Sequence, residues 1–391
     1  MTIAASPTQR DIAYRGFQLP DDMTASSGDG LLATHRGLAL DGADQRGTWT
    51  SPPVRVGFTV AEVVPSWTAD TPDGCWIEVD LRGWHGDAAS TDWYRLARWA
   101  ADDHAVRRAS VPGQRDGDAR VDTDTLIVTG ATVTGWQARV TLCRPIDSPT
   151  GPRLRSIGAV ATGPAPTVPT GSTDPTDEPG YDADEAAARG RVLDVPCYSQ
   201  RLHAGQYPQW GGGGDSWCSP TCTSMVLAYW GAEPVPEHYA WVEPSGPRPV
   251  VVHAARHCYD HAYAGAGNWP FNTAYAGLHG VDAFVTRLRS LVEAEAFLAA
   301  GIPLIVSAAF RADEVPGLAY DTGGHLMVLV GFTADGDPVL NDPYAPDDDT
   351  VRRTVPRQRF EAVWQRGSGG VAYVLRPPSV PLPPPPAQAN W

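Results

Sequence analysis

The stretch Asp215-Ser-Trp-Cys-Ser-Pro-Thr-Cys-Thr-Ser-Met-Val-Leu-Ala-Tyr-Trp230 decides how the C-terminal half of this 391-residue sequence is interpreted. It predicts a helix from about residue 216 to residue 230, with Ser216 or Asp215 as the N-cap. Pro220 fits the first turn, where backbone N–H groups have no intrahelical partner. Cys218 would then lie in the positive field of a helix N-terminus, which favours the thiolate. The motif alone leaves two interpretations open, a nucleophilic thiol and a buried structural cysteine.

The other cysteines are predicted to be structural. The six cysteines are irregularly spaced and form no CxxC pair, which argues against a disulfide scaffold and against a zinc ribbon. Cys222 follows Cys218 by one helical turn, and we expect it to pack inward with Met225 and Val226. Only Cys218 has a local context that suggests chemistry.

A cysteine nucleophile needs a base, and the base needs a group that orients it. His325 follows two glycines and opens an apolar strand in Thr322-Gly-Gly-His-Leu-Met-Val-Leu-Val-Gly331. Asp342 ends the next strand-like run, Val339-Leu-Asn-Asp-Pro343, after the turn at 334–337. If the two strands pair antiparallel, Asp342 comes close to His325. Asn341 competes for this place, but strand alternation puts the two on opposite faces.

An oxyanion site is the fourth requirement of this chemistry. The backbone N–H of Cys218 supplies one donor, and the side-chain amide of Gln200 is the candidate for the second. Taken alone, Gln200 would be interpreted as an ordinary surface residue, and it becomes a candidate only together with Cys218, His325 and Asp342.

These four segments carry a resemblance to a known family. Ser199-Gln200, Trp217-Cys-Ser-Pro-Thr221, the segment around His325 and Asn341-Asp-Pro343 resemble, in this order, the C39-like cysteine peptidase family of the papain-like superfamily. The resemblance covers about residues 190 to 376. It implies a papain-like fold with Cys218 as nucleophile, His325 as base, Asp342 as orienting residue and Gln200 as oxyanion donor. Ser219 stands where glycine is more usual, and its side chain could narrow the site.

The N-terminal half has a strand-like pattern. Alternating runs at 75–82, 93–99 and 135–142, separated by Asp- and Gly-rich turns, predict an antiparallel β-sandwich. Seven tryptophans lie before residue 159, and they either fill the sandwich core or form an exposed surface that stacks on sugars or peptides. This half also looks like a domain that accompanies peptidase-like modules in actinobacterial proteins.

The expected fold class is therefore α+β, with four parts. Residues 1–158 form a β-sandwich accessory domain, 159–190 a Pro-, Thr- and Asp-rich linker, and 191–376 a C39-like peptidase domain. Residues 377–391 form a Pro-rich tail of polyproline II type, which we expect to lie outside the fold.

Composition excludes several function classes. The net charge is −15, so no basic face for nucleic acid is expected. All 30 basic residues are arginine, which excludes Schiff-base, pyridoxal-phosphate and Walker-lysine chemistry. No apolar run is long enough to span a bilayer. No signal peptide is legible, so the cytoplasm is the default location, and secretion follows if a leader is missing.

Two further motifs were weighed against the cysteine site. His253, His257 and His261 recur every four residues on an expected helix at about 250–263, which makes a histidine stripe that is either a zinc site, a wall of the cleft or a plain polar face. The run Gly211–Gly214 is followed by no lysine and is not a P-loop, so we expect it to give the loop before Cys218 freedom to move.

The sequence thus favours a cysteine hydrolase that cleaves amide bonds, peptide bonds above all, and that needs no cofactor and no metal. An acyltransferase or amidase would use the same thioester and stays an alternative. A non-catalytic protein that binds a glycan or a peptide through its N-terminal domain is the third hypothesis.

Overall fold

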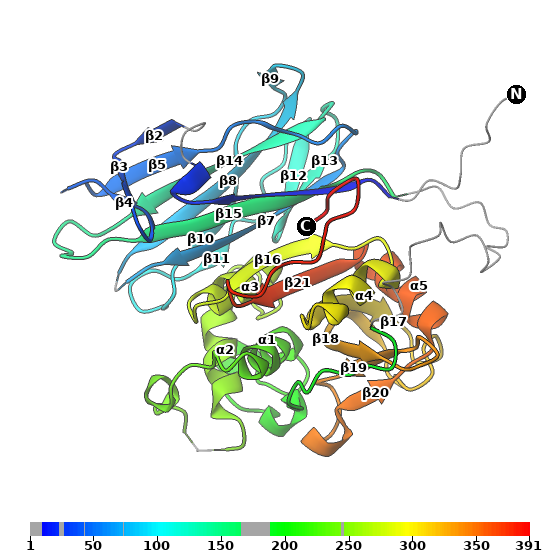
Figure 1. Ribbon diagram of the computed structural model, residues 1–391. Helices are drawn as coiled ribbons and strands as arrows, with labels where there is room; N and C mark the ends of the chain where they lie inside the picture. The colour runs from blue at the N-terminus through cyan, green and yellow to red at the C-terminus, as the bar shows by residue number, and fades with distance from the viewer. Residues whose placement is uncertain (1–9, 23–26, 43, 73, 166–187, 244–245) are drawn as a thin grey trace, which may run out of the picture.

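The computed structural model describes residues 10–22, 27–42, 44–72, 74–165, 188–243 and 246–391. Most of the expected linker lies outside the described residues. Figure 1 shows a β-rich N-terminal half packed on a mixed C-terminal half, with the C-terminus running back between them. The coarse α+β class is confirmed by antiparallel sheets accompanied by helices.

The N-terminal half consists of two antiparallel sheets. The first contains β1 (Ile12–Gln18), β3 (Leu31–Thr34), β4 (Gly37–Leu40), β7 (Glu62–Asp70), β12 (Ala119–Asp122), β13 (Thr125–Val128) and β15 (Arg153–Thr162). The second contains β2 (Ser27–Asp29), β5 (Arg46–Thr50), β6 (Val54–Arg55), β8 (Trp76–His85), β9 (Ala88–Ala89), β10 (Tyr94–Trp99), β11 (Ala109–Ser110) and β14 (Gly135–Cys143). The sheets stack face to face: Phe17 of the first contacts Trp49 of the second with ring centroids 5.5 Å apart.

The tryptophans of this half divide between two environments. Four of them fill the space between the sheets and are fully buried: Trp49, Trp67, Trp99 and Trp136. The other three are half-buried on the outward side of the second sheet: Trp76, Trp84 and Trp93. The core interpretation therefore holds for four of the seven tryptophans, and the other three are partly accessible at the surface.

The C-terminal half is built around a six-stranded antiparallel sheet. Its order is β16 (Asp282–Arg287), β21 (Val371–Arg376), β17 (Leu304–Phe310), β18 (Thr322–Phe332), β19 (Pro338–Asn341) and β20 (Arg352–Thr354). Its helices are α1 (Cys218–Tyr229), α2 (Pro249–Cys258), α3 (Trp269–Gly277), α4 (Leu291–Ala299) and α5 (Arg357–Ser368), with 3-10 turns η3 (Gln200–His203), η4 (Pro208–Trp210), η5 (Pro236–Tyr239) and η6 (Asp348–Thr350). Just before η3, Val192 pairs with Gly331 of β18 in one isolated antiparallel bridge.

Helix α1 lies against β18, and this packing positions the site. Met225 and Val226 are fully buried, and the thiol of Cys222 donates to the Leu326 carbonyl at 3.3 Å. None of the helices in the described parts of the chain is both long and apolar enough to cross a membrane.

The two halves share a buried interface. Arg108 of the N-terminal half is fully buried, and its guanidinium donates to the carbonyls of Tyr259 at 3.0 Å and Arg256 at 2.8 Å in the C-terminal half. Phe271 of α3 enters the N-terminal core, with its ring centroid 5.3 Å from that of Trp99. A charged side chain buried this way needs every donor paired, so the contact holds only when both halves are in place.

The Pro-rich tail corrects one expectation. It does not lie outside the fold, because Asn390 is fully buried and donates to the Arg287 carbonyl at 2.7 Å and to Glu293 at 2.8 Å. The backbone N–H of Tyr14 in β1 donates to Ala389 at 3.1 Å. The tail is thus hydrogen-bonded to both halves, through the side chain of Asn390 and the backbone of Ala389, which a pattern dominated by proline did not reveal.

Candidate active site

Cys218 lies in the first turn of α1, as predicted, but the helix begins at Cys218 itself and is capped differently. The N-cap position belongs to Trp217, which makes no side-chain capping bond. The hydroxyl of Ser216 donates instead to the carbonyls of Gly211 at 2.7 Å and Gly213 at 3.1 Å. Ser216 therefore braces the glycine-rich loop, and the first-turn N–H groups of α1 keep their favourable field for an anion.

The glycines of the loop at 211–214 allow its backbone to pack closely against residues 203–204. All four residues from Gly211 to Gly214 have positive φ angles, between 34° and 93°, a region that other residues rarely adopt. A Cβ at Gly213 would collide with the carbonyl of His203. These glycines are therefore explained by a tight backbone approach, whereas the sequence suggested freedom of movement.

His325 and Asp342 lie side by side, as the strand pairing predicted. The Nε2 atom of His325 is 2.8 Å from Oδ1 of Asp342, and their side chains are only 6% and 2% exposed. Asn341 points the other way, because its amide donates to the Val195 carbonyl at 3.2 Å and its oxygen accepts from Arg352 at 3.1 Å. The strand register thus selects the carboxylate over the amide.

Two tyrosines complete the surroundings of Asp342, and the sequence reasoning missed both. The hydroxyl of Tyr320 donates to Oδ2 of Asp342 at 3.1 Å, and the backbone N–H of Tyr344 donates to Oδ1 at 2.9 Å. Both rings stand edge-on to the imidazole of His325. The position of Tyr344, directly after Asp342-Pro343, was a usable signal, whereas Tyr320 lies in an unpatterned loop.

The charges of the three groups are coupled. Burial alone raises the pKa of Cys218, but the hydrogen bond and charge of His325 outweigh it and lower the pKa overall. Burial alone lowers the pKa of His325, but Asp342 and Cys218 raise it to about 10. Burial alone raises the pKa of Asp342, and His325 and two donors bring it below its ordinary value. The arrangement therefore stabilises a thiolate beside an imidazolium.

The residues next to Cys218 are structural. Burial and the Cys218 charge raise the pKa of Cys222 well above its usual range, which keeps this thiol protonated. The hydroxyl of Ser219 lies 3.0 Å from that of Tyr373, and both residues are fully buried. The side chain of Ser219 thus points into the core rather than narrowing the site.

Gln200 is buried and tied to the loop before Cys218. Its amide nitrogen donates to the Gly214 carbonyl at 2.6 Å, and its backbone N–H donates to Pro343 at 2.9 Å, next to Asp342. The side chain is fully buried, so the surface alternative does not hold. Gln200 is therefore linked to both segments that flank the site, through backbone atoms on each side.

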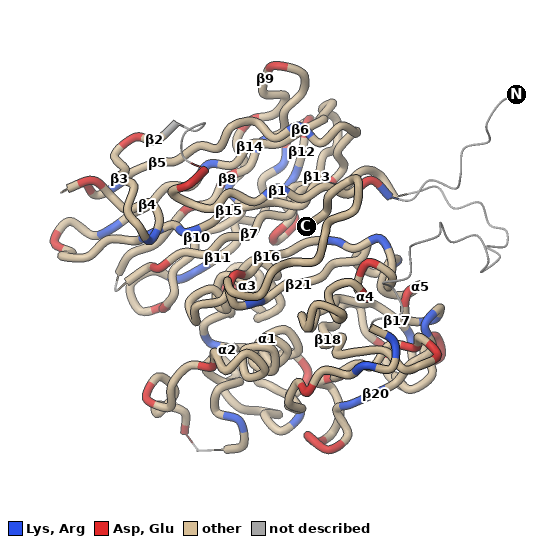
Figure 2. The backbone as a smooth tube through the Cα atoms, in the orientation of Figure 1, with Lys and Arg blue, Asp and Glu red and all other residues tan. Residues whose placement is uncertain are grey.

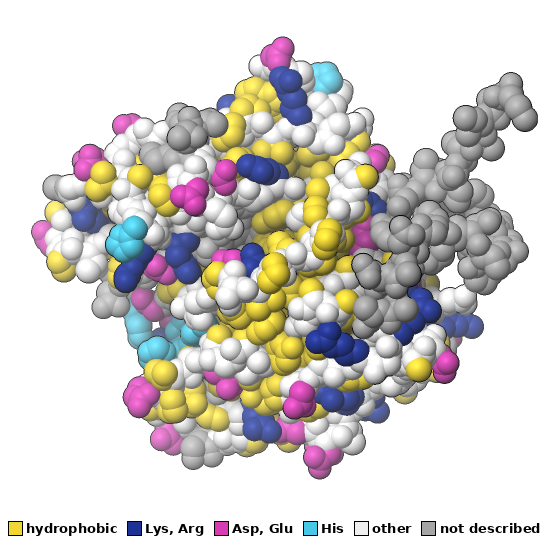
Figure 3. Space-filling model, viewed as in Figure 1, with side chains coloured by type: hydrophobic (Ala, Val, Ile, Leu, Met, Phe, Trp, Pro, Cys, Tyr) yellow, Lys and Arg dark blue, Asp and Glu magenta, His cyan; other side chains and the backbone are white. Residues whose placement is uncertain are grey.

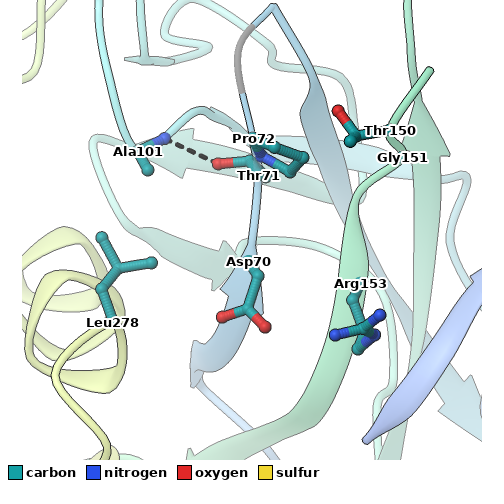
Figure 4. A pocket seen from close by; sticks show the side chains of 8 residues that line it. All are labelled: Asp70, Thr71, Pro72, Ala101, Thr150, Gly151, Arg153 and Leu278. Atoms are coloured by element: carbon teal, nitrogen blue, oxygen red, sulfur yellow. Dashed lines mark hydrogen bonds between the residues drawn. The ribbon is translucent and has the colours of Figure 1, made fainter. Parts of the chain in front are cut away.

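Two exposed glycines border the site beside His325. Gly323 and Gly324 precede it and are exposed, and a Cβ at either glycine would meet no atom within 4 Å. A cavity of about 470 Å³ lies elsewhere, where the N-terminal half meets the residue after α3; Figure 4 shows it between Asp70, Arg153 and Leu278.

The histidine stripe is broken by the end of α2. His253 and His257 stack with ring centroids 3.9 Å apart, but the helix ends at Cys258, and His261 turns toward Asp103 at 3.7 Å. Figure 3 shows histidine side chains gathered at the junction of the two halves. Within the described ranges, no group of three or more His, Cys, Asp or Glu residues is arranged to hold a metal ion.

Comparisons with known proteins give two family matches. Residues 32–162 match the Peptidase C39 N-terminal domain, and residues 192–371 match the Peptidase_C39 like family. A comparison with curated proteins finds no match.

Two solved structures resemble parts of the chain. One is a Bacillus anthracis protein described as a putative C39-like peptidase, with 18% identity over 47% of this chain and 97% of that chain and a TM-score of 0.29. The other is the Emp46p carbohydrate recognition domain in its potassium-bound form, with 12% identity over 36% of this chain and 83% of that chain and a TM-score of 0.17.

Proposed function

We propose that this protein is a cysteine hydrolase that cleaves peptide bonds. The premise is that the chain belongs to the C39-like peptidase family through its C-terminal half and carries the N-terminal domain that accompanies it. The observation that carries the proposal is the coupled group of Cys218, His325 and Asp342, with the thiol at a helix N-terminus and its pKa lowered. A structural cysteine gains nothing from such an arrangement.

His325 acts as the base in this proposal. Because Asp342 binds Nε2, the other ring nitrogen, Nδ1, is left to face the thiol. The thiolate of Cys218 attacks the substrate carbonyl and forms a C–S bond. The imidazolium gives its proton to the leaving amine as the C–N bond breaks, so the amine is released and the acyl group stays on Cys218 as a thioester. Water, deprotonated by the same imidazole, then hydrolyses the thioester and restores the free thiol.

The developing oxyanion needs donors that are already in place. The N–H of Cys218 is one of the unpaired donors of the first helical turn. An amide nitrogen carries two hydrogens, and the contact with Gly214 uses only one of those on Gln200. We assign the second hydrogen to the oxyanion. We also propose that residues 191–376 form a domain with a papain-like fold.

Thiol labelling tests the nucleophile. Cys218 should react with iodoacetamide at pH 7 at least about 100-fold faster than Cys222 and Cys258, because burial raises the pKa of both of those thiols. Mass spectrometry of digested protein after timed labelling resolves the three sites. Equal rates at all three would remove the basis for a nucleophile.

Substrate digestion tests the reaction. A peptide library incubated with wild type and with Cys218→Ala should give new amino termini only with wild type. Repeating the digestion with glycinamide as a competing amine separates a hydrolase from an acyltransferase, because the thioester is common to both and only the acceptor differs. Selective labelling without any turnover would favour the third hypothesis, a binding protein.

A further inference from the structure

The outward face of the second sheet carries an unusual set of side chains. Along β8, the residues Ile77, Val79 and Leu81 enter the core, and the alternate residues point outward. The first sheet faces the C-terminal half, since Tyr14 of β1 stacks on Phe284 of β16 at 4.7 Å. The outward face of β8, β10 and β14, called here the outer face, therefore points away from the cysteine site.

Two buried carboxylates organise arginines on the outer face. Glu78 pairs with Arg46 and Arg95, each at 2.8 Å, and with Arg98 at 3.8 Å. Asp80 pairs with Arg95 at 2.8 Å and with Arg139 at 2.9 Å. The carboxylates are covered, whereas the side chains of Arg46 and Arg98 are 60% and 50% exposed. Figure 2 shows the basic positions of these strands in blue.

Arg82 adds a charge that none of these carboxylates balances. Its guanidinium donates to the amide oxygen of Gln137 at 2.6 and 2.8 Å. Burial and the nearby charge of Arg139 lower the pKa of Arg82. The outer face thus carries five arginines and two carboxylates, which leaves three excess positive charges on a chain whose net charge is −15. The five are Arg46, Arg82, Arg95, Arg98 and Arg139.

Indole rings accompany these charges. Arg82 and Arg139 each lie 4.4 Å from the ring centroid of Trp93, and Arg82 lies 5.3 Å from that of Trp84. Trp76 lies at the other end of β8, eight residues from Trp84, a separation of about 27 Å at 3.4 Å per residue. This length suits an extended polymer better than a small molecule.

We propose that the outer face binds an anionic polysaccharide, with its carboxylates on the arginines and its sugar rings on the tryptophans. The guanidinium fork matches a carboxylate in shape, and an indole offers a flat apolar surface to a pyranose ring. A chain of acidic amino acids would use the arginines and leave the indoles unused. The proposal concerns the N-terminal half alone and does not depend on the chemistry of Cys218.

Binding of polygalacturonate to the full chain tests the proposal. The protein is used as Cys218→Ala, so that no hydrolysis interferes, and dextran and poly-glutamate serve as neutral and peptide probes. Polygalacturonate should bind, more weakly as salt rises, whereas dextran should not. Trp93→Ala should weaken binding roughly fivefold, and the double variant Arg46→Gln/Arg98→Gln about tenfold, while Arg95 still pairs with Glu78.

The controls separate this site from general charge effects. Arg311→Gln removes an exposed arginine of the C-terminal half and should leave binding unchanged. Thermal unfolding checks that each variant is folded. Equal binding of poly-glutamate, an unchanged affinity of Trp93→Ala, or no binding of polygalacturonate to folded protein would each overturn the proposal.

Discussion

Replacing Asp342 by asparagine should disconnect the imidazole from its charge while keeping its geometry. The two side chains have the same shape, so the asparagine oxygen can accept from His325 and Tyr344, and the hydroxyl of Tyr320 can turn to accept from the new NH₂ group. What is lost is a buried negative charge beside a positive ring.

The size of the effect follows from the geometry. Two unit charges about 4 Å apart interact by roughly 4 kcal/mol at an effective dielectric constant of about 20. Because a change of one in pKa corresponds to about 1.4 kcal/mol, the pKa of His325 should fall by about three. The pKa of Cys218 should rise in turn, since the imidazolium that stabilises its thiolate is weakened.

Iodoacetamide labelling of Cys218 from pH 4 to pH 10 measures this directly. Each upward shift of one in the thiol pKa reduces the thiolate about tenfold below that pKa, so Asp342→Asn should react at least about tenfold more slowly at acidic pH. Peptide cleavage should fall by roughly 100-fold or more. Asp215→Asn is the matched control, because this exposed carboxylate lies three residues before Cys218 and pairs with Arg201. Superimposable pH profiles for wild type and Asp342→Asn would refute the reasoning.

Three other substitutions test the surroundings. Burial raises the pKa of Asp124 to about 6. Its ionisation therefore lowers the free energy of unfolding by up to roughly 3 kcal/mol as pH rises from about 4 to 6. Asp124→Asn should be more stable than wild type to urea at pH 7 but not at pH 4. Asn390→Ala should lower the free energy of unfolding by about 2 kcal/mol, because a hydrogen bond to the carboxylate of Glu293 is lost. Tyr320→Phe removes one donor from Asp342 and should slow cleavage by less than about tenfold.

Each of these has a neighbouring control. Asp122→Asn, on the same hairpin but exposed, should show no stability gain at pH 7, and an equal gain would contradict the role of burial. Pro385→Ala in the exposed part of the tail should leave the free energy of unfolding unchanged. Tyr344→Phe keeps the backbone donor to Asp342, so a loss of cleavage as large as that of Tyr320→Phe would argue against the hydroxyl contact.

The elements that sequence patterns predicted are those with a clear periodicity or a fixed chemical order. Residues 135–142 alternate strictly, and β14 extends over Gly135–Cys143. The two-residue period of a strand predicted that only one of Asn341 and Asp342 can face His325, and the structure places Asp342 there. Such local rules act on neighbouring residues, so one sequence is enough to read them.

What the sequence did not reveal depends on contacts between distant segments. The end of α2 before His261 reflects Asp260, whose carboxylate accepts from the backbone of Ser110 in the other half at 3.0 Å. The burial of Asn390 depends on Glu293, 97 residues earlier in the chain. Tyr320, in the loop between β17 and β18, reaches Asp342 from 22 residues earlier in the chain. Neither the spacing of residues nor the composition predicts these long-range contacts.

The buried guanidinium of Arg108 limits how this protein can be taken apart. Its guanidinium extends from the N-terminal half and donates to carbonyls at the end of α2. The N-terminal half alone would therefore expose an unpaired guanidinium, and the C-terminal half alone would expose unpaired carbonyl acceptors. The halves should therefore melt in a single transition, and two separately produced fragments should complement one another in solution. Exchange of the N-terminal half among related chains is then constrained by one side chain. A recombinant chain without the acceptor carbonyls of Tyr259 and Arg256 should fail to fold.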